Sequence, residues 1–224
     1  MHSGVFKGCA DHEGATPNLD LRLEGIFVIP EFLSIMDEGN LVRFLDESSS
    51  FSGWKHSQSG RRKQDFGPRA NFKKRKLNTS GVIGMPKELE SIMKRIQLVV
   101  RQLTMKEYHI VEVSALEYTN ANSSSIDPHI DDTWLWGNRI GGLNLLEDTV
   151  MTFVNSEGAA VDVFLPRGAF FLLSNVSRYD WLHGIRLENI KKRRISFTFR
   201  EFSDALDVDD EVIKDVMKRT SIFV

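Results

Sequence analysis

Hydrophobic residues recur at two different spacings along this chain, and the spacing divides it into helical and extended parts. The first apolar run covers residues 23–29 and ends at Pro30, which predicts a strand. Ser34 and Asp37 then resemble a helix start. Pro86 opens the clearest helix, whose apolar residues lie three and four positions apart. A last helix is predicted from Asp207 to Lys218, with one apolar stripe formed by Val208, Val212, Ile213, Val216 and Met217.

Between about residues 109 and 202 the apolar spacing changes to two, which is typical of half-buried strands. Turn residues separate these short runs, for example at 155–158 and 166–168. Short strands preceded by helices predict a mixed α+β fold, a double-sheet jelly roll with helices packed on one face. The predicted strands are 109–118, 139–146, 149–154, 160–165, 169–174, 181–187 and 193–202.

Length and composition limit the protein classes that fit. At 224 residues with 41% hydrophobic content, the chain can bury one substantial core. We expect a flexible leader over 1–18, a single domain over 19–203 and the C-terminal helix within 204–224. The net charge of -2 argues against a uniformly basic nucleic-acid binder. A single cysteine, Cys9, excludes an internal disulfide, and no segment has the length of a membrane span, so we expect a cytoplasmic and nuclear protein.

One segment, residues 57–77, is strongly basic despite the overall charge. Asp65 is its only acid, while Phe66 and Phe72 lie among the cations and Gly67-Pro68 disfavours a continuous helix, which predicts a loop or irregular ribbon. A solvated, mobile charge run is one interpretation. The other is a lid that holds an acidic partner, such as a phosphate backbone or an acidic protein surface. The cations are Arg61, Arg62, Lys63, Arg69, Lys73, Lys74, Arg75 and Lys76.

A metal site is the chemistry that the stretch 127–134 indicates. Side chains alternate faces along a strand, so His129 and Asp131 would point the same way while Asp132 points to the other face. His183 would complete a triad of two histidines and one carboxylate, which suits iron(II) and leaves positions open for a co-substrate and oxygen. A His-x-Asp pair alone is a weak signal, and a histidine in an apolar strand such as 181–185 is usually a core residue.

The last predicted strand adds an independent feature, because residues 194–200 alternate polar and apolar without interruption. Its polar face carries Arg194 and Arg200, whose backbones lie roughly 20 Å apart at about 3.3 Å per residue. Both guanidinium groups could lean inward onto the two carboxylates of a small diacid, since arginine binds carboxylates through a two-pronged fork. Two solvent-facing arginines are the simpler interpretation of this strand alone.

The pattern His129-x-Asp131, His183 and Arg194-x5-Arg200 resembles the AlkB family of Fe(II)/2-oxoglutarate dioxygenases, which have a double-stranded β-helix core. Segments 57–77, 126–137, 143–146 and 196–201 are similar to the homologue-four branch in particular, and the resemblance covers residues 23–202. It implies iron ligation by the triad. It also implies that the two arginines hold the carboxylates of 2-oxoglutarate, with Tyr118 as a hydroxyl donor.

Two positions depart from the family pattern. Many AlkB-type proteins have an asparagine two residues before the tyrosine, where this chain has Leu116. The homologue-four branch commonly carries a cysteine-rich stretch before the catalytic domain, where this sequence has only Cys9. A cofactor contact and a function of the preceding stretch are therefore not transferred from the family.

The resemblance implies oxidative demethylation, in which 2-oxoglutarate is converted to succinate and a hydroxylated N-methyl group leaves as formaldehyde. The implied substrate is an N-methyl lysine of a protein, actin in this branch, with N-methyl adenine in DNA as the alternative. A non-catalytic jelly-roll binding module and a hydroxylase that keeps its product remain open. Trp134 and Trp136 are either core aromatics or walls for a methylammonium or a base. The predicted substrate-binding residues are Arg61, Arg62, Lys63, Lys73, Lys74, Trp134 and Trp136.

Overall fold

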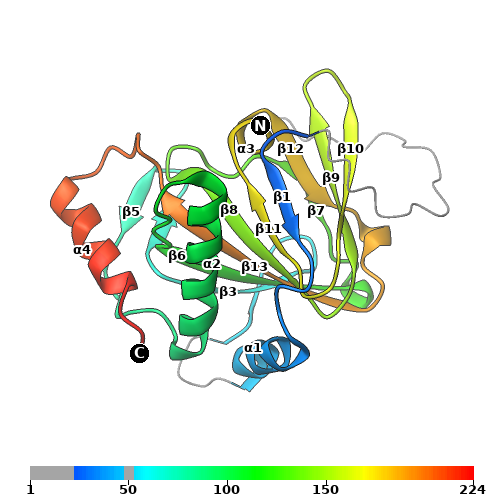
Figure 1. Ribbon diagram of the computed structural model, residues 1–224, viewed down its shortest axis with the longest axis horizontal. Coiled ribbons are helices and arrows are strands. Elements are labelled where there is room, and N and C mark those ends of the chain that lie inside the picture. Colours follow the sequence, from blue (N-terminus) through cyan, green and yellow to red (C-terminus); the bar gives the residue numbers. More distant parts are fainter. Residues whose placement is uncertain (1–22, 48–52) are drawn as a thin grey trace.

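A computed structural model describes residues 23–47 and 53–224 of the chain, so the predicted leader over 1–18 lies outside the described residues. Figure 1 shows two sheets face to face, with α2 across the outer face of the larger sheet and α4 at the far end of the molecule from β9 and β10. The helices are α1 (Ile35–Glu47), α2 (Glu90–Thr104), α3 (Asn175–Tyr179) and α4 (Asp210–Thr220), with short 3-10 turns at Lys87–Leu89, Asn120–Asn122 and Leu187–Asn189.

The larger sheet has the order β1-β11-β8-β13-β6-β3-β2, and the smaller one has the order β10-β9-β12-β7. All pairings within both sheets are antiparallel. The larger sheet consists of β1 (Ile26–Ile29), β2 (Lys55–His56), β3 (Arg62–Phe66), β6 (Glu112–Thr119), β8 (Trp136–Leu145), β11 (Phe170–Leu173) and β13 (Arg193–Phe202). The smaller sheet consists of β7 (Ile126–His129), β9 (Thr149–Asn155), β10 (Ala160–Leu165) and β12 (Trp181–Ile185), and a separate hairpin is formed by β4 (Arg69–Asn71) and β5 (Lys76–Asn78).

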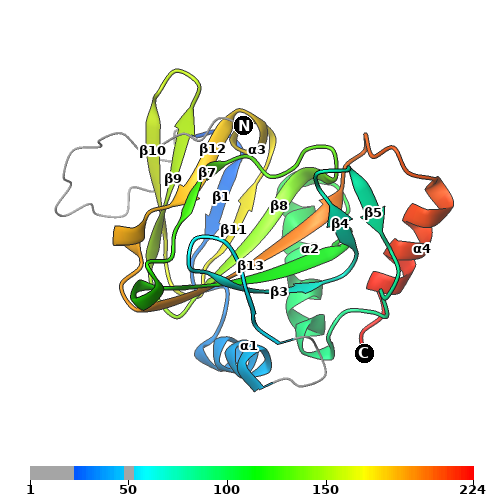
Figure 2. The same cartoon turned by 180° about the vertical axis from the view of Figure 1, so that it is seen from behind.

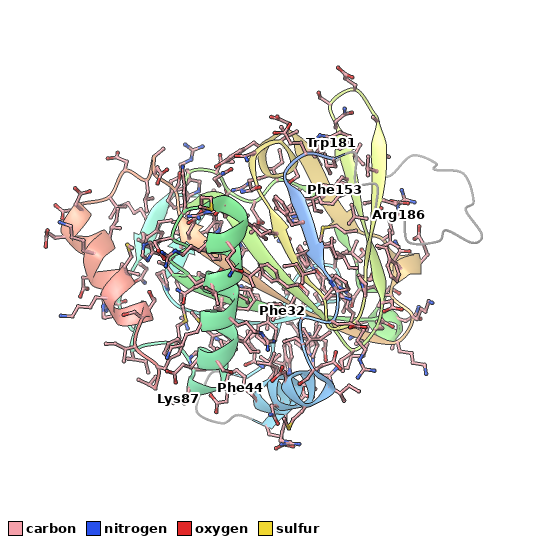
Figure 3. The ribbon with its side chains drawn as sticks, in the orientation of Figure 1. Phe32, Phe44, Lys87, Phe153, Trp181 and Arg186 are labelled. Carbon is pink, nitrogen blue, oxygen red and sulfur yellow. The ribbon has the colours of Figure 1, made fainter. Side chains whose placement is uncertain are left out.

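Two apolar layers hold these elements together, and they confirm the predicted mixed α+β architecture with helices on one face. Phe44 of α1 belongs to the layer between the helices and the larger sheet, and Phe153 of β9 belongs to the layer between the two sheets; both are labelled in Figure 3. β13 borders both layers because its side chains alternate. Ile195, Phe197 and Phe199 face the helices, while Arg194, Ser196, Thr198 and Arg200 line a cavity between the sheets.

The start of α1 follows the sequence prediction, whereas the last helix starts later than predicted. Ser34 Oγ accepts a hydrogen bond from the Asp37 N–H at 3.0 Å, and the Asp37 carboxylate accepts one from the Ser34 N–H at 3.1 Å. In α4 the capping side chain is Asp209 rather than Asp207, because the Asp209 carboxylate accepts a hydrogen bond from the Glu211 N–H. The apolar stripe of this helix still packs inward through Ile213, Val216 and Met217.

The prediction of a loop or irregular ribbon for the basic segment is wrong where the segment forms strands. Residues 62–66 pair with β6 as an added strand of the larger sheet, and residues 69–78 form the β4–β5 hairpin. Gln64 and Phe66 are buried along β3, so one face of this strand packs against the protein. This burial stabilises the strand although its sequence is rich in charge. In Figure 2, which shows the reverse side, the hairpin lies next to α4.

The hairpin, α4 and the segment before β8 share a third apolar cluster. Leu135 and Trp136 are at its centre, and Leu77 and Met217 pack against them. None of the described helices is long and apolar enough to cross a membrane.

Candidate metal centre

The pairing of β7 with β12 brings the two predicted histidine ligands together. His129 lies directly opposite His183 in the ladder, and their ring centroids are 4.5 Å apart. β7 ends at His129, so Asp131 lies just beyond the strand rather than within it as predicted. Its carboxylate nevertheless reaches the same place, because one ligand atom from each of the three residues lies within 4.8 Å of the other two.

The His129 ring is oriented by the backbone of Asp127. Nδ1 lies 2.9 Å from the Asp127 carbonyl oxygen and donates to it, which leaves Nε2 as the nitrogen with a free lone pair. Nε2 is 3.5 Å from Oδ1 of Asp131. Burial lowers the pKa of His129, but the adjacent carboxylate more than offsets this and the pKa is raised overall. A cation between these two groups would take the place of the proton that they otherwise share.

His183 is a buried, neutral ligand candidate. Burial, followed by the charge of His129, lowers the pKa of His183 to about 3. The imidazole is therefore neutral at pH 7. Its Nδ1 is buried and has no hydrogen-bond partner among the described residues. A buried imidazole of this kind is costly as a plain core residue and suits a metal ligand.

Arg200 holds the Asp131 carboxylate from the side opposite His129. Its Nη2 donates to Oδ2 of Asp131 at 3.3 Å, and its Nη1 donates to Oε2 of Glu112 at 2.8 Å. Burial raises the pKa of Asp131, yet the charge of Arg200 and the adjacent His129 hold it well below its usual range. The ligand is therefore a carboxylate. Burial raises the pKa of Glu112 to about 7 although Arg200 opposes the change.

An inner cavity between the sheets is lined by the three triad residues and also by Tyr118 and Arg194. Arg194 is 1% exposed, and its Nε donates to Oδ1 of Asn144 at 2.6 Å. Its Nη1 and Nη2 are buried without a hydrogen-bond partner among the described residues.

The guanidinium of Arg194 lies over the Tyr118 ring, and its two unpaired nitrogens in the lining of the inner cavity can donate to a bound acceptor. A carboxylate matches the fork of Arg194 and would satisfy both donors. Arg200 lines the same cavity near the triad, so the two predicted arginines border one space, as a diacid would require. The donor set of two imidazoles and one carboxylate suits iron(II). The residues present therefore fit both the metal and 2-oxoglutarate.

A wider outer cleft of about 490 Å³ opens onto the other side of the triad. His129 and Asp131 line both this cleft and the inner cavity, so a molecule in the cleft would meet the metal site from outside. Carboxylates of Asp65, Glu112 and Asp132 line the cleft, with Trp136 and Phe72 as aromatic walls.

The structure brings only part of the predicted substrate-binding set to this cleft. Lys63 lines it and forms an ion pair with Asp65 at 2.7 Å. Arg61 is buried and donates to the Gln58 carbonyl oxygen, and Arg62 is paired with Glu117, so both point elsewhere. Lys73 and Lys74 are exposed between the two strands of the hairpin and are not part of the cleft lining.

The two tryptophans have different positions. Trp136 is 5% exposed, stacks on Phe202 and lines the cleft, so it is both a core residue and a wall. Trp134 is half-buried and meets Phe72 edge to face, with ring centroids 6.4 Å apart. Leu116 borders both cavities at the position where the family pattern has an asparagine.

Two polar residues that contact the site were missed in the sequence. Asn144 is fully buried and fixes Arg194, and Glu112 is buried and pairs with Arg200. Each lies in a predicted strand at a position whose neighbours are mostly apolar. A buried polar residue in such a strand is the signal that would have identified them.

Comparison with known proteins determines the family. No family model matches the chain. The human protein named alpha-ketoglutarate-dependent dioxygenase alkB homolog 4 is 34% identical in an alignment of 210 positions, gaps included, that covers 80% of this chain and 67% of the human protein. The mouse protein of the same name is 33% identical and is covered to 68%. The chain belongs to the AlkB family of 2-oxoglutarate-dependent dioxygenases.

Other proteins are similar in sequence or in fold. A Caenorhabditis elegans protein named DNA N6-methyl adenine demethylase is 36% identical over 183 residues, 81% of this chain, and the chain spans 61% of that relative's length. The solved structure of OsALKBH1 shares the fold with a TM-score of 0.57 at 14% identity, over 79% of this chain and 98% of that one. A Pseudomonas putida prolyl-4-hydroxylase has a TM-score of 0.53 at 13% identity, over 80% of this chain and 92% of that one. The predicted family and the jelly-roll fold are thus confirmed, and the cofactors of this family are iron(II) and 2-oxoglutarate.

A glycine next to His183 allows the close approach of β7 and β12 that forms the AlkB-type triad. A Cβ on Gly184 would lie 2.7 Å from the Ile126 carbonyl oxygen and 3.0 Å from the Pro128 nitrogen. We expect Gly184→Ala to push the strands apart and weaken Co(II) binding about 10-fold or more, as displaced ligand geometry does at other sites. Calorimetric titration of the metal-free protein with Co(II) measures this.

Gly39→Ala is the matched control, because a Cβ on Gly39 of α1 would meet nothing within 4 Å. This variant should bind Co(II) like the wild type, with an unchanged or slightly higher Tm, since alanine favours helix more than glycine does. Native Co(II) affinity in Gly184→Ala would contradict the role given to this glycine.

Proposed function

We propose that this protein is an Fe(II)- and 2-oxoglutarate-dependent oxidative demethylase that removes an N-methyl group from a protein lysine. The observation that carries the proposal is that triad residues line two cavities, of which one is also lined by Arg194 with its unpaired Nη groups and the other by hairpin residues Arg69 and Phe72. The first cavity suits a buried diacid. The second suits a substrate that enters from solvent.

The chain's own residues would bind and orient the reactants. His129, Asp131 and His183 would hold the metal, while Arg194 would hold a carboxylate of 2-oxoglutarate. Bound iron(II) and 2-oxoglutarate supply the oxidation of the methyl group. Arg200 keeps Asp131 ionised, and the apolar side chains of Phe171, Leu173 and Ile185 keep water out of the inner cavity.

Part of the outer cleft wall suits a cationic substrate. Asp132 contributes a carboxylate there and Phe72 an exposed aromatic ring, whereas Asp65 is already paired with Lys63 and the Trp136 ring with Arg200. Carboxylates with an aromatic surface attract a methylammonium by charge and by cation–π contact. A methylated lysine has this chemistry, and the sequence resemblance implies that actin is the protein that carries it.

Methylated adenine in DNA is the second candidate, and two observations favour it. The exposed cations of the hairpin, from Lys73 to Lys76, are next to the cleft residues Arg69 and Phe72 and could contact phosphates. The C. elegans relative is named a DNA N6-methyl adenine demethylase. Either substrate agrees with a cytoplasmic and nuclear location, which stays a prediction.

His129→Ala and Asp131→Ala should each abolish the formation of succinate from 2-oxoglutarate, because either change removes a metal ligand. Succinate is measured by mass spectrometry, and circular dichroism verifies the fold. His109→Ala, which changes an exposed histidine outside the site, should keep the full rate. Undiminished turnover in either triad variant would exclude this mechanism. No consumption of 2-oxoglutarate by the wild type, with partner binding that persists without iron, would favour a binding module with an inactive metal site.

Formaldehyde release from a methyl-lysine protein and from methyl-adenine DNA, compared under equal iron, ascorbate and 2-oxoglutarate, decides between the two substrates. We expect faster release from the methyl-lysine protein because of the carboxylates in the cleft. Formaldehyde release from the methyl-adenine DNA alone would favour the second candidate function over the first. Succinate formation without formaldehyde from either substrate would indicate a hydroxylase with a stable product.

Replacing Lys73, Lys74, Arg75 and Lys76 with glutamine should weaken binding of the acidic partner at least 10-fold. The rate of 2-oxoglutarate turnover without substrate should stay the same, because these side chains are outside the inner cavity. Binding is measured by fluorescence anisotropy at two salt concentrations.

A matched variant changes four other exposed cations, Lys94, Lys106, Lys191 and Lys218, to glutamine and has the same net charge. It should bind the partner like the wild type. Equal losses of partner binding in both variants would mean that total charge, rather than the hairpin, governs binding.

A further inference from the structure

Arg178, a residue of α3, is completely buried without a carboxylate bound to it. Its exposed fraction is 0%, and it is one of the two arginines among the largest fully buried side chains of the described residues. Its hydrogen bonds go to three backbone carbonyl oxygens. Nη1 donates to Asp131 at 3.0 Å, Nη2 donates to Trp136 at 3.2 Å and Nε donates to Gly137 at 3.2 Å.

These three carbonyls belong to the segment that carries the carboxylate ligand. Asp131 begins the turn that leads into β8, and Trp136 and Gly137 are the first residues of that strand. The turn is also closed by a hydrogen bond from the Trp136 N–H to the Asp132 carbonyl oxygen. One guanidinium group therefore joins both ends of the Asp131–Gly137 turn.

Arg178 is also close in the chain to the histidine ligand His183. α3 ends at Tyr179 and β12, which carries His183, begins at Trp181. α3 is itself fixed by a capping box between Ser174 and Ser177, both of which are buried. The position of Arg178 is thus set by a rigid turn of the chain directly before the strand of His183.

A buried cation is costly, and the shape of arginine explains its presence here. Desolvation of a charge is compensated only by well-placed partners, and the planar fork can serve three carbonyls at once where a lysine ammonium acts as a single point. Methionine would fill a similar volume without the charge. A side chain needed only to pack this region would be cheaper without charge.

We propose that Arg178 is a positioning residue for the metal centre, which fixes the Asp131 turn against the segment that carries His183. This inference rests on the metal site of the proposed function and adds to it a residue that does not touch the metal. Arg178 acts through the backbone of Asp131, whereas Arg200 acts through its carboxylate. The two arginines together fix both ends of the ligand residue.

Arg178→Met and Arg178→Lys test the role through metal binding in the absence of 2-oxoglutarate and substrate. Metal-free protein is titrated with Co(II), and both the affinity and the visible absorption of the bound ion are measured, because the absorption depends on coordination geometry. We expect the Co(II) Kd to rise about 10- to 100-fold in Arg178→Met, as it does when groups that orient ligands are lost. Arg178→Lys should give a smaller rise with an altered spectrum.

Arg139→Met is the matched control for the loss of a buried arginine. Arg139 also donates to two backbone carbonyls, those of Lys106 and Glu107, but its side chain pairs with Glu201 outside both cavities of the site. This variant should lower the Tm and keep the wild-type Co(II) affinity and spectrum. An equal loss of affinity in Arg139→Met at a matched Tm would overturn the positioning role.

Wild-type Co(II) affinity and spectrum in either Arg178 variant would also overturn it. If Arg178→Met fails to fold, Arg178→Lys decides. Co(II) titration of the wild type and of His129→Ala, which lacks a ligand, tests the metal site itself and so separates this inference from the proposed function. Absence of Co(II) binding in the wild type would refute the metal site, and with it the role of Arg178, whereas intact wild-type binding with unaffected Arg178 variants would refute the positioning role alone.

Discussion

The antiparallel pairing of β7 with β12 is the interaction on which the site depends. It places His129 opposite His183, and the distance between the rings follows from the spacing of neighbouring strands rather than from a flexible loop. The carboxylate ligand has no such support, since it lies past the end of β7. Hydrogen bonds to its side chain from Arg200 and to its carbonyl from Arg178 supply what the ladder does not. The centre thus combines two ligands fixed by the sheet with one fixed by arginines.

β13 shows how one strand serves both stability and chemistry. Its apolar face packs under α2, so its position is determined by the largest core layer, and its polar face carries both arginines of the inner cavity. A shift of one residue in its register would exchange these faces and bury the wrong set. The unpaired Nη groups of Arg194 are therefore maintained by a strand that has no freedom to move them towards water. Because these Nη groups are kept away from water, a carboxylate that enters the cavity would form strong hydrogen bonds with them.

Periodicity and spacing predicted much of this molecule, because burial imposes them locally. Most strands between 109 and 202, α2 and the alternation of β13 follow from apolar positions, and the triad follows from the residue types of β7, the turn after it and β12. Sequence patterns did not reveal which residues distant in the chain pair with one another. Arg61 and Arg62 look like free cations until β3 joins β6 and Arg62 meets Glu117. Arg178 lies in a helix of five residues, too short for a periodic pattern, and its partners are carbonyls, which no side chain marks.

The central position of β13 in the larger sheet has a consequence for how the protein folds. It is the last strand of the described chain, yet it lies between β8 and β6, and the final arginines of the site arrive with it. Until it inserts, β6 and β8 have no partner on their facing edges, and the inner cavity lacks a wall. Contacts between residues so far apart in sequence form slowly. The arginines of the inner cavity are therefore in place only once β13 pairs with both neighbours, and a chain without β13 would leave two strand edges open to pairing with other chains.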